Sequence, residues 1–148
     1  MKKYIILLLL LSSCELFNPT DYEVQEELKP YVDSFYQDGS NLGYQLPQDN
    51  LIIKLQKGLR ESCQCYGRTT WEEGDWSANP QVRTYIDEDY FYKVDSANKA
   101  FTIYHELGHG VLKRKAHTNR TSIMNPDCHR LCKTGRTLLP ELYKNKEN

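Results

Sequence analysis

Apolar residues recur at helical spacing between residues 97 and 112, and this is the clearest periodic signal in the chain. The dipeptide Asp95-Ser96 precedes the stretch and can cap a helix. The cationic run 113–115 follows it, where the carbonyl end of a helix stabilises positive charge. The sequence therefore predicts one helix from Ala97 to Leu112. Its apolar side would consist of Ala100, Ile103, Tyr104, Leu107, Val111 and Leu112.

Two shorter stretches have the patterns of β-strands. Residues 51–55 (LIIKL) form an apolar run typical of a buried strand, and residues 82–87 (VRTYID) alternate between apolar and polar positions. Between them, the stretch from Gly67 to Pro80, which contains glycine and two tryptophans, predicts a long loop.

The two ends of the chain predict further helices. The polar stretch from Asn18 to about Pro47 predicts a tether with one helix around residues 23–36. A final helix is expected to begin near Pro140, within residues 137–145, because proline is favoured in the first turn of a helix.

The first fourteen residues have the layout of an export signal. Lys2 and Lys3 precede the apolar run 4–11, which is too short to span a membrane as a helix. The tetrapeptide Leu11-Ser12-Ser13-Cys14 resembles the bacterial lipobox, which implies removal of residues 1–13 and acylation of Cys14. The alternative is an ordinary signal peptide cleaved nearby. Acyl chains would anchor the protein to a membrane of the bacterial cell envelope, at the periplasmic face of the outer membrane or at the cell surface.

The other cysteines predict disulfides. Apart from Cys14, the chain contains Cys63, Cys65, Cys128 and Cys132, and an even number of cysteines in an exported protein favours two bridges. Pairing within Cys-x-Cys is strained, so bridges from the 63/65 pair to the 128/132 pair are favoured. A structural zinc site made of the four thiolates is the alternative.

The charge of the chain excludes one large class of partner. The 19 basic and 20 acidic residues give a net charge of −1, without the basic footprint of a protein that binds nucleic acid. Acidic side chains gather in two groups, which could bind Ca²⁺, although a solvated acidic loop is favoured. These groups are Glu72, Glu73 and Asp75, and Asp87, Glu88 and Asp89. Nothing in the sequence indicates an oligomeric state.

The strongest chemical signal lies inside the predicted helix, where residues 105–109 read HELGH. His105 and His109 would project from one helix face about one turn apart, close enough to bind a single metal ion. Glu106 would lie beside them, where it can accept a proton from water held by the metal. His117 is a candidate third ligand.

The segment HELGHGVLKRKAH, followed by SIMN at residues 122–125, resembles the metzincin clan of zinc peptidases. The clan has HExxHxxGxxH and then a turn that contains methionine, and SIMN resembles the matrixin version of this turn. The chain is also similar to small zinc metallopeptidase lipoproteins of Gram-negative bacteria, over roughly residues 82 to 145.

The resemblance implies a site and a fold. It implies one catalytic Zn²⁺ bound by His105, His109 and His117, with Glu106 as general base and Met124 as the floor of the site. The implied fold class is α+β: a short mixed sheet packed on the active-site helix, with a Met-turn and a C-terminal helix. It also implies that strand 82–87 is the edge strand, which lines the cleft and pairs with an extended substrate.

The spacing of the third histidine departs from the clan pattern. His117 follows His109 by eight residues instead of six, and Leu112 occupies the place of the helix-ending glycine. An unbroken helix would carry His117 about 12 Å along the axis, too far to share a metal. We therefore expect a wide turn through Lys115 and Ala116. His129 and Asp127 are the alternative third ligands.

The expected function is that of a zinc-dependent endopeptidase that hydrolyses peptide or protein substrates at a membrane. The implied domains are a signal peptide at 1–13, a lipidated tether at 14–47 and the peptidase domain at 48–148. Two alternatives remain open. One is a gluzincin-like peptidase with Glu141 as third ligand, and the other is a non-catalytic surface lipoprotein that binds zinc.

Overall fold

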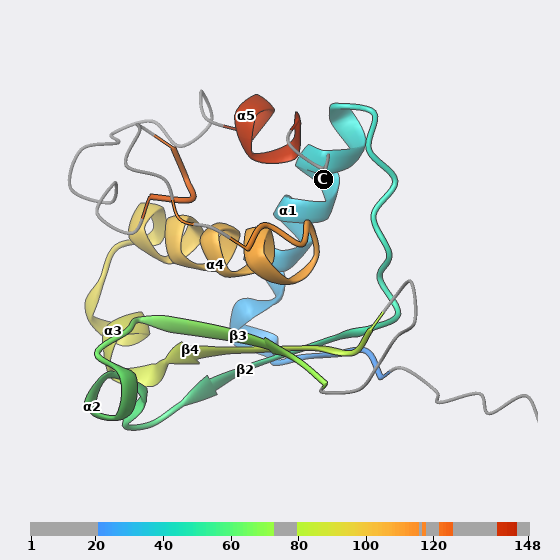
Figure 1. Cartoon of the computed structure of the whole chain (residues 1–148). Coiled ribbons are helices and arrows are strands. Elements are labelled where there is room, and N and C mark those ends of the chain that lie inside the picture. Colours follow the sequence, from blue (N-terminus) through green and yellow to red (C-terminus); the bar gives the residue numbers. More distant parts are fainter. Residues whose placement is uncertain (1–20, 73–79, 116, 118–121, 126–138, 145–148) are drawn as a thin grey trace, which may run out of the picture.

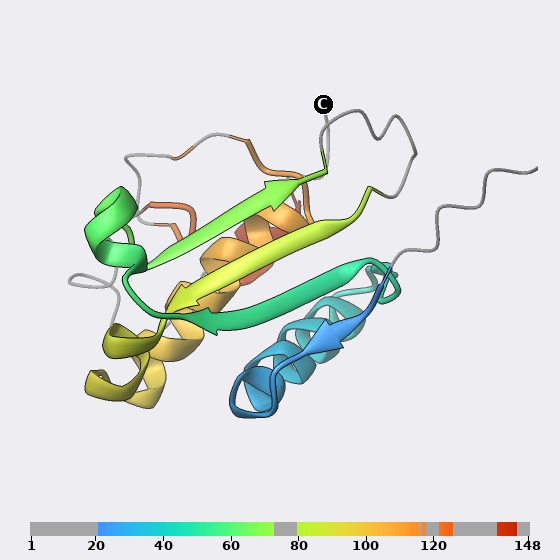
Figure 2. The ribbon, with the colours of Figure 1, turned by 90° about the horizontal axis from the view of Figure 1, so that it is seen from below.

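Four strands form one mixed sheet in the computed structural model, which describes residues 21–72, 80–115, 117, 122–125 and 139–144. The order across the sheet is β1-β2-β4-β3 (Figures 1 and 2). β1, β2 and β4 run parallel to one another, and β3 is antiparallel to β4. The strands are β1 (Glu23–Val24), β2 (Leu51–Gln56), β3 (Gly67–Trp71) and β4 (Val82–Asp87).

The larger helices cover one face of this sheet. Figure 1 shows α1, α4 and α5 above the strands, and Figure 2, seen from below, shows the strands in front of the helices. The helices are η1 (Glu26–Leu28), α1 (Lys29–Asn41), α2 (Leu59–Cys63), α3 (Glu88–Lys93), α4 (Ser96–Gly110) and α5 (Leu139–Lys144). This mixture of helices with a small mixed sheet agrees with the predicted α+β class. In the part of the chain that the structure describes, no helix has the length and apolar character needed to cross a membrane.

The predicted strands and the long helix are confirmed. β4 has the predicted bounds, and Val82, Thr84 and Ile86 are buried while Arg83 and Tyr85 on the other face are less so. Helix α4 begins after Asp95, whose carboxylate accepts a hydrogen bond from the Asn98 amide as an N-cap. Burial of the apolar side of α4 against the sheet and α1 therefore places the HELGH segment at the end of a fixed helix.

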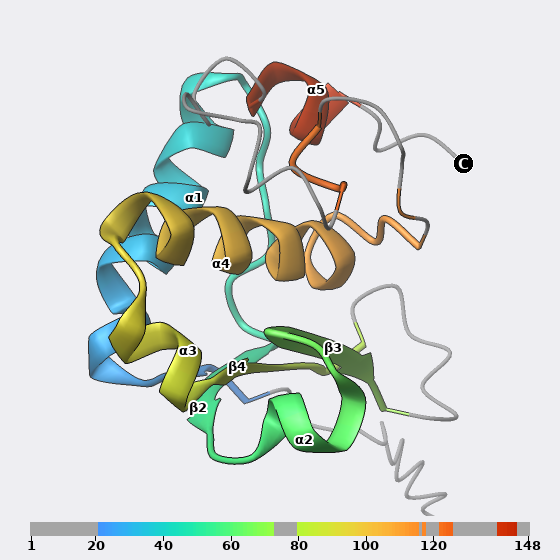
Figure 3. The same ribbon diagram turned by 90° about the vertical axis from the view of Figure 1, so that its left-hand side faces the viewer.

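Glycine allows α4 to lie very close to the sheet. A Cβ atom at Gly110 would lie 2.5 Å from Cγ1 of Val82 and 3.1 Å from Cγ2 of Thr69, so a side chain at this position would push the helix off β3 and β4. Figure 3 shows the result, with α4 lying between the sheet and α5.

The segment before residue 48 is part of the folded unit, which corrects the prediction of a tether. Residues 23–24 pair with β2 as a strand, and the helix starts at Lys29 instead of near residue 23. Val32 and Phe35 of α1 are fully buried in the core. The folded unit therefore begins before the predicted boundary, because β1 and α1 complete the sheet and its covering layer.

The prediction of a long loop at 67–80 was also wrong at its beginning. Residues 67–71 form β3, which pairs with β4 along its full length. β4 is consequently an inner strand, and β3 is the edge strand next to α4. The expectation that strand 82–87 forms the edge is therefore corrected. The elements α2 and α3 were not predicted.

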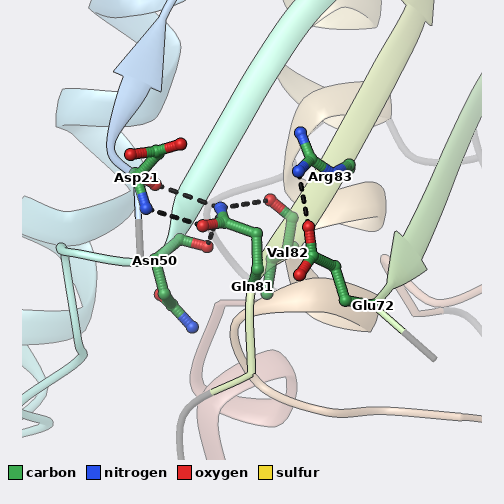
Figure 4. Close-up of polar contacts among 6 residues, drawn as sticks. All are labelled: Asp21, Asn50, Glu72, Gln81, Val82 and Arg83. Carbon is green, nitrogen blue, oxygen red and sulfur yellow. Dashed lines mark hydrogen bonds and ion pairs between the residues drawn. The ribbon is translucent and has the colours of Figure 1, made fainter. Parts of the chain in front are cut away.

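Two of the acidic residues near these strands, Asp87 and Glu72, have structural partners. Both oxygens of Asp87 accept backbone amide hydrogen bonds, from Tyr90 at 2.8 Å and Arg60 at 3.0 Å. Glu72 pairs with Arg83 (Figure 4). Asp87 thus caps α3, and no calcium-type cluster of carboxylates occurs within the described ranges. Glu73 and Asp75 lie outside them.

One buried amide ties three segments together at the end of the sheet. The Gln81 side chain is almost fully buried, and its nitrogen donates to the carbonyls of Asp21 at 3.0 Å and Asn50 at 2.9 Å. Its oxygen accepts from the Asp21 amide at 2.6 Å (Figure 4). Gln81 therefore joins the approach to β1, the start of β2 and the start of β4.

Replacement of this amide should destabilise the fold. Gln81→Leu keeps the volume but leaves buried backbone groups without partners, so the free energy of unfolding should fall by about 1–3 kcal/mol. Equilibrium unfolding in urea measures it. Arg83→Gln, which breaks an exposed ion pair beside the same strand end, is the control and should change stability much less. Equal effects of the two substitutions would contradict the role given to Gln81.

Candidate metal centre

Three imidazoles from two segments of the chain meet at one point. The Nε2 atoms of His105 and His109 are 3.2 Å apart, and that of His117 lies 3.2 Å from the first and 3.0 Å from the second. Nitrogens bound to one tetrahedral Zn²⁺ at 2.0–2.1 Å are separated by about 3.3 Å. The three nitrogens therefore have the spacing of ligands that share one metal ion, and the three residues form a group that could hold one.

Backbone carbonyls fix which nitrogen of two imidazoles is free. Nδ1 of His105 lies 2.7 Å from the carbonyl oxygen of Ile123, and Nδ1 of His109 is bonded to the carbonyl oxygen of Arg114. A carbonyl oxygen only accepts, so each Nδ1 carries the proton and donates it. Each Nε2 is then left with a lone pair that points toward the other histidines, as metal ligation requires.

Burial keeps these imidazoles neutral. Burial lowers the pKa of His105 to about 4; the hydrogen bond to Ile123 opposes this shift, and the neighbouring His109 and His117 add to it. Burial likewise lowers the pKa of His109. Both rings are therefore uncharged at pH 7, which is the form that binds metal.

The chain turns toward His117 at Lys113, earlier than predicted. α4 ends with a bond one residue wider than an α-helical one, from the Leu112 amide to the Leu107 carbonyl oxygen. The Arg114 amide then bonds to the carbonyl oxygen of Gly108, six residues before it. Lys113 then takes a left-handed conformation, with φ of 56°. The turn thus begins before the expected residues, Lys115 and Ala116, and Ala116 lies outside the described residues. The widened helix end thus accommodates the two residues by which the spacing from His109 to His117 exceeds the clan pattern, and it does so without a glycine.

Glu106 lies in the same cleft as the three histidines. The cleft has a volume of about 820 Å³, with α4 and His117 on one side and residues 64–69 and Trp71 on the other. The Glu106 side chain is buried, and burial raises the pKa of its carboxyl to about 7, against the effect of a hydrogen bond from Thr69. A carboxyl whose pKa lies near neutrality can take up and release a proton at physiological pH.

The contacts of Glu106 with β3 were not predicted. Thr69 Oγ1 lies 2.8 Å from Oε2 of Glu106, and a Cβ atom at Gly67 would lie within 2.5 Å of its Cγ atom. Both partners precede Glu106 by more than 30 residues, so no local pattern could have indicated them.

The predicted SIMN turn is present, and it contacts the back of α4. The amide of Asn125 bonds to the carbonyl oxygen of Ser122 at 3.1 Å, which closes a turn. Met124 is fully buried, and its Sδ atom lies 2.6 Å from the position that a Cβ of Gly108 would occupy. Met124 thus packs behind the helix and is not among the described residues that line the cleft. The turn reaches His105 through the Ile123 carbonyl.

Cys63 and Cys65 form a disulfide with each other. Gln64 between them has a left-handed conformation, with φ of 56°, and this brings the two Cα atoms to 5.2 Å. The favoured pairing with Cys128 and Cys132 is therefore corrected for these two residues, and as a disulfide they offer no thiolate to a metal. Cys65 lines the cleft.

Several predicted site residues lie outside the described residues: Cys14, Asp127, Cys128, His129 and Cys132. Glu141 lies on α5 and does not belong to the group of ligand atoms, whereas His117 does.

Comparison of the chain with protein-family models, curated proteins and solved structures found no match.

The cluster predicts a single metal site. A chain offered Zn²⁺ should retain about one ion after dialysis, and His117→Ala should retain markedly less, because two imidazoles bind more weakly than three. Elemental analysis measures both, and His129→Ala is the matched control, expected to bind like the wild type. If His129→Ala loses the metal and His117→Ala retains it, the third ligand is His129 and not His117.

Proposed function

We propose that the protein is a zinc-dependent endopeptidase of metzincin-like type. The observation that carries the proposal is the triangle of three Nε2 atoms with a buried carboxyl, Glu106, in the same open cleft. A structural zinc site closes its coordination with four protein ligands, whereas a catalytic site keeps a position open and needs a base nearby. His105, His109 and His117 would hold the metal and leave such a position.

Bound Zn²⁺ would supply a Lewis acid that polarises a carbonyl and makes water more acidic. The chain itself provides the proton transfer. Glu106 would accept the proton of the attacking water on its carboxylate and deliver it to the leaving amine, so that the group returns to its starting state.

The edge strand β3 offers backbone groups to an extended peptide. The Asp87 amide bonds to the carbonyl oxygen of Tyr66, and the Glu72 amide bonds to that of Gln81 just before β4. By the alternation of an antiparallel ladder, the residues at 67, 69 and 71 therefore direct their amides and carbonyls away from β4. All three line the cleft. A substrate that adds as a further strand would therefore run past Glu106, which favours a peptide over a small molecule.

Anchoring at a bacterial membrane stays a prediction from the sequence, since Cys14 and the segment before it lie outside the described residues. A lipid on Cys14 would place the cleft at a membrane surface. It would not alter the chemistry argued for His105, Glu106 and His109.

The proposal predicts that catalysis and metal binding can be separated. Glu106→Gln removes the proton acceptor but no imidazole, so zinc content should stay near that of the wild type while peptide cleavage falls roughly 10²-fold or more. Mass spectrometry of a mixed peptide library measures cleavage, with a chelated sample beside it. Glu61→Gln, an exposed position on α2, is the matched control and should cleave normally.

A protein that only binds zinc would give another result. Wild type, Glu106→Gln and Glu61→Gln would then hold the same amount of metal, and none would cleave any peptide. That result would replace the peptidase proposal with the non-catalytic one.

A further inference from the structure

We propose that Thr69, supported by Thr84 and Gly67, is the positioning residue for the carboxylate of Glu106. The inference rests on the proposed function, since it assigns Glu106 the role of base. It adds that the edge strand, and not the helix alone, sets the direction of this side chain. Thr69 does not itself touch the reacting atoms and acts through Glu106.

Thr84, Thr69 and Glu106 form a hydrogen-bond network, and the single proton of each hydroxyl determines which group donates to which. Thr69 Oγ1 has one proton and three acceptors within reach: Oε2 of Glu106 at 2.8 Å, the Glu106 carbonyl oxygen at 3.1 Å and Thr84 Oγ1 at 3.1 Å. Oε2 is the nearest of the three and, when Glu106 is the carboxylate that acts as base, the only charged one, so in this state the proton goes to Oε2. The Thr84 hydroxyl must then donate to Thr69, which completes a chain from Thr84 through Thr69 to Glu106.

Burial limits the competition of water for the hydrogen bonds that link Thr84, Thr69 and Glu106. Thr84 is fully buried, and Glu106 is 6% exposed, so water has little access to the two ends of this network. Thr69 and Thr84 are directly paired residues of β3 and β4, so the sheet holds their side chains side by side on the face toward α4. The position of the donor is therefore fixed by two strands, and a buried hydrogen bond of this kind restricts its acceptor.

Gly67 closes the other side of the carboxyl group. A Cβ atom at this position would lie 2.7 Å from Oε1 and 2.8 Å from Cδ of Glu106. Gly67 and Thr69 are two apart on β3 and so face the same way. One strand thus presents a hydroxyl to Oε2 and an empty space to Oε1.

This arrangement connects the base to the substrate. The same residues, Gly67 and Thr69, direct their backbone amides and carbonyls toward the cleft, where an extended peptide would pair. Their side-chain positions orient Glu106, and their main chain would orient the scissile bond. A strand that sets both positions fixes the distance between base and carbonyl, which is the quantity on which proton transfer depends.

Removal of the Thr69 hydroxyl should therefore act on turnover and not on binding. Thr69→Val preserves the shape and the strand preference of the side chain. It should lower kcat roughly 10-fold to 100-fold, the range expected for loss of a hydrogen bond to a charged group, with KM and zinc content within about twofold of the wild type. Thr69→Ser should restore most of kcat. Thr70→Val, on the opposite face of β3, is the matched control and should leave kcat unchanged.

Crystal structures of wild type, Thr69→Val and Thr70→Val supply a measurement that does not need activity. The Glu106 carboxylate should leave its position beside Gly67 in Thr69→Val alone. If the wild type cleaves peptides but Thr69→Val has unchanged kcat, the positioning role is overturned while the peptidase stands. If the wild type cleaves nothing, the proposed function falls. The position of the Glu106 side chain in these crystals then tests the positioning role by itself. A Glu106 side chain in Thr69→Val that has not moved from its wild-type position overturns that role.

Gly67→Ala tests the same claim if Thr69→Val does not fold. The added methyl group overlaps the Glu106 side chain, so kcat should fall by a similar factor with zinc retained. Unchanged kcat in a zinc-loaded Gly67→Ala protein would overturn the proposal.

Discussion

The close packing of α4 between the sheet and the 122–125 turn is the constraint on which the site depends. Gly110 lets the helix approach β3 and β4, and Gly108 leaves room for Met124 on the other side. Because both faces of the helix are fixed, the carbonyl oxygen of Ile123 reaches His105 and the hydroxyl of Thr69 reaches Glu106. A larger residue at either glycine would separate the groups that the site brings together.

This packing buries His105 and Glu106 and part of His109 where water is scarce, which is unfavourable for the fold alone. Burial lowers the pKa values of His105 and His109 and raises that of Glu106, so all three are driven toward their uncharged forms. Backbone carbonyls and one threonine hydroxyl satisfy part of their hydrogen-bonding capacity, but the three Nε2 atoms face one another. A metal ion at their centre would resolve this arrangement, and we infer that the fold is arranged to bind one.

Local sequence patterns predicted the long helix and its histidines. Features that depend on contacts between residues far apart in the chain could not be predicted in this way. The apolar spacing from Ile103 to Leu112 and the HELGH segment were sufficient to predict α4 and the two histidines that it contributes to the cluster. β3 was missed because Gly67 suggested a loop and Thr69 and Thr70 are not apolar. Its strand character comes from pairing with β4 and from contact with α4. The left-handed turn at Lys113 was likewise missed, since its cause is the widened helix end and not a glycine.

X-ray absorption at the zinc edge of the metal-loaded protein tests the central claim most directly, because it reports the atoms bound to the metal without requiring a substrate. The account predicts three imidazole nitrogens and one oxygen ligand from solvent, all at about 2.0–2.1 Å. A shell that contains sulfur at about 2.3 Å, or that has only two imidazoles, would contradict a site built by His105, His109 and His117.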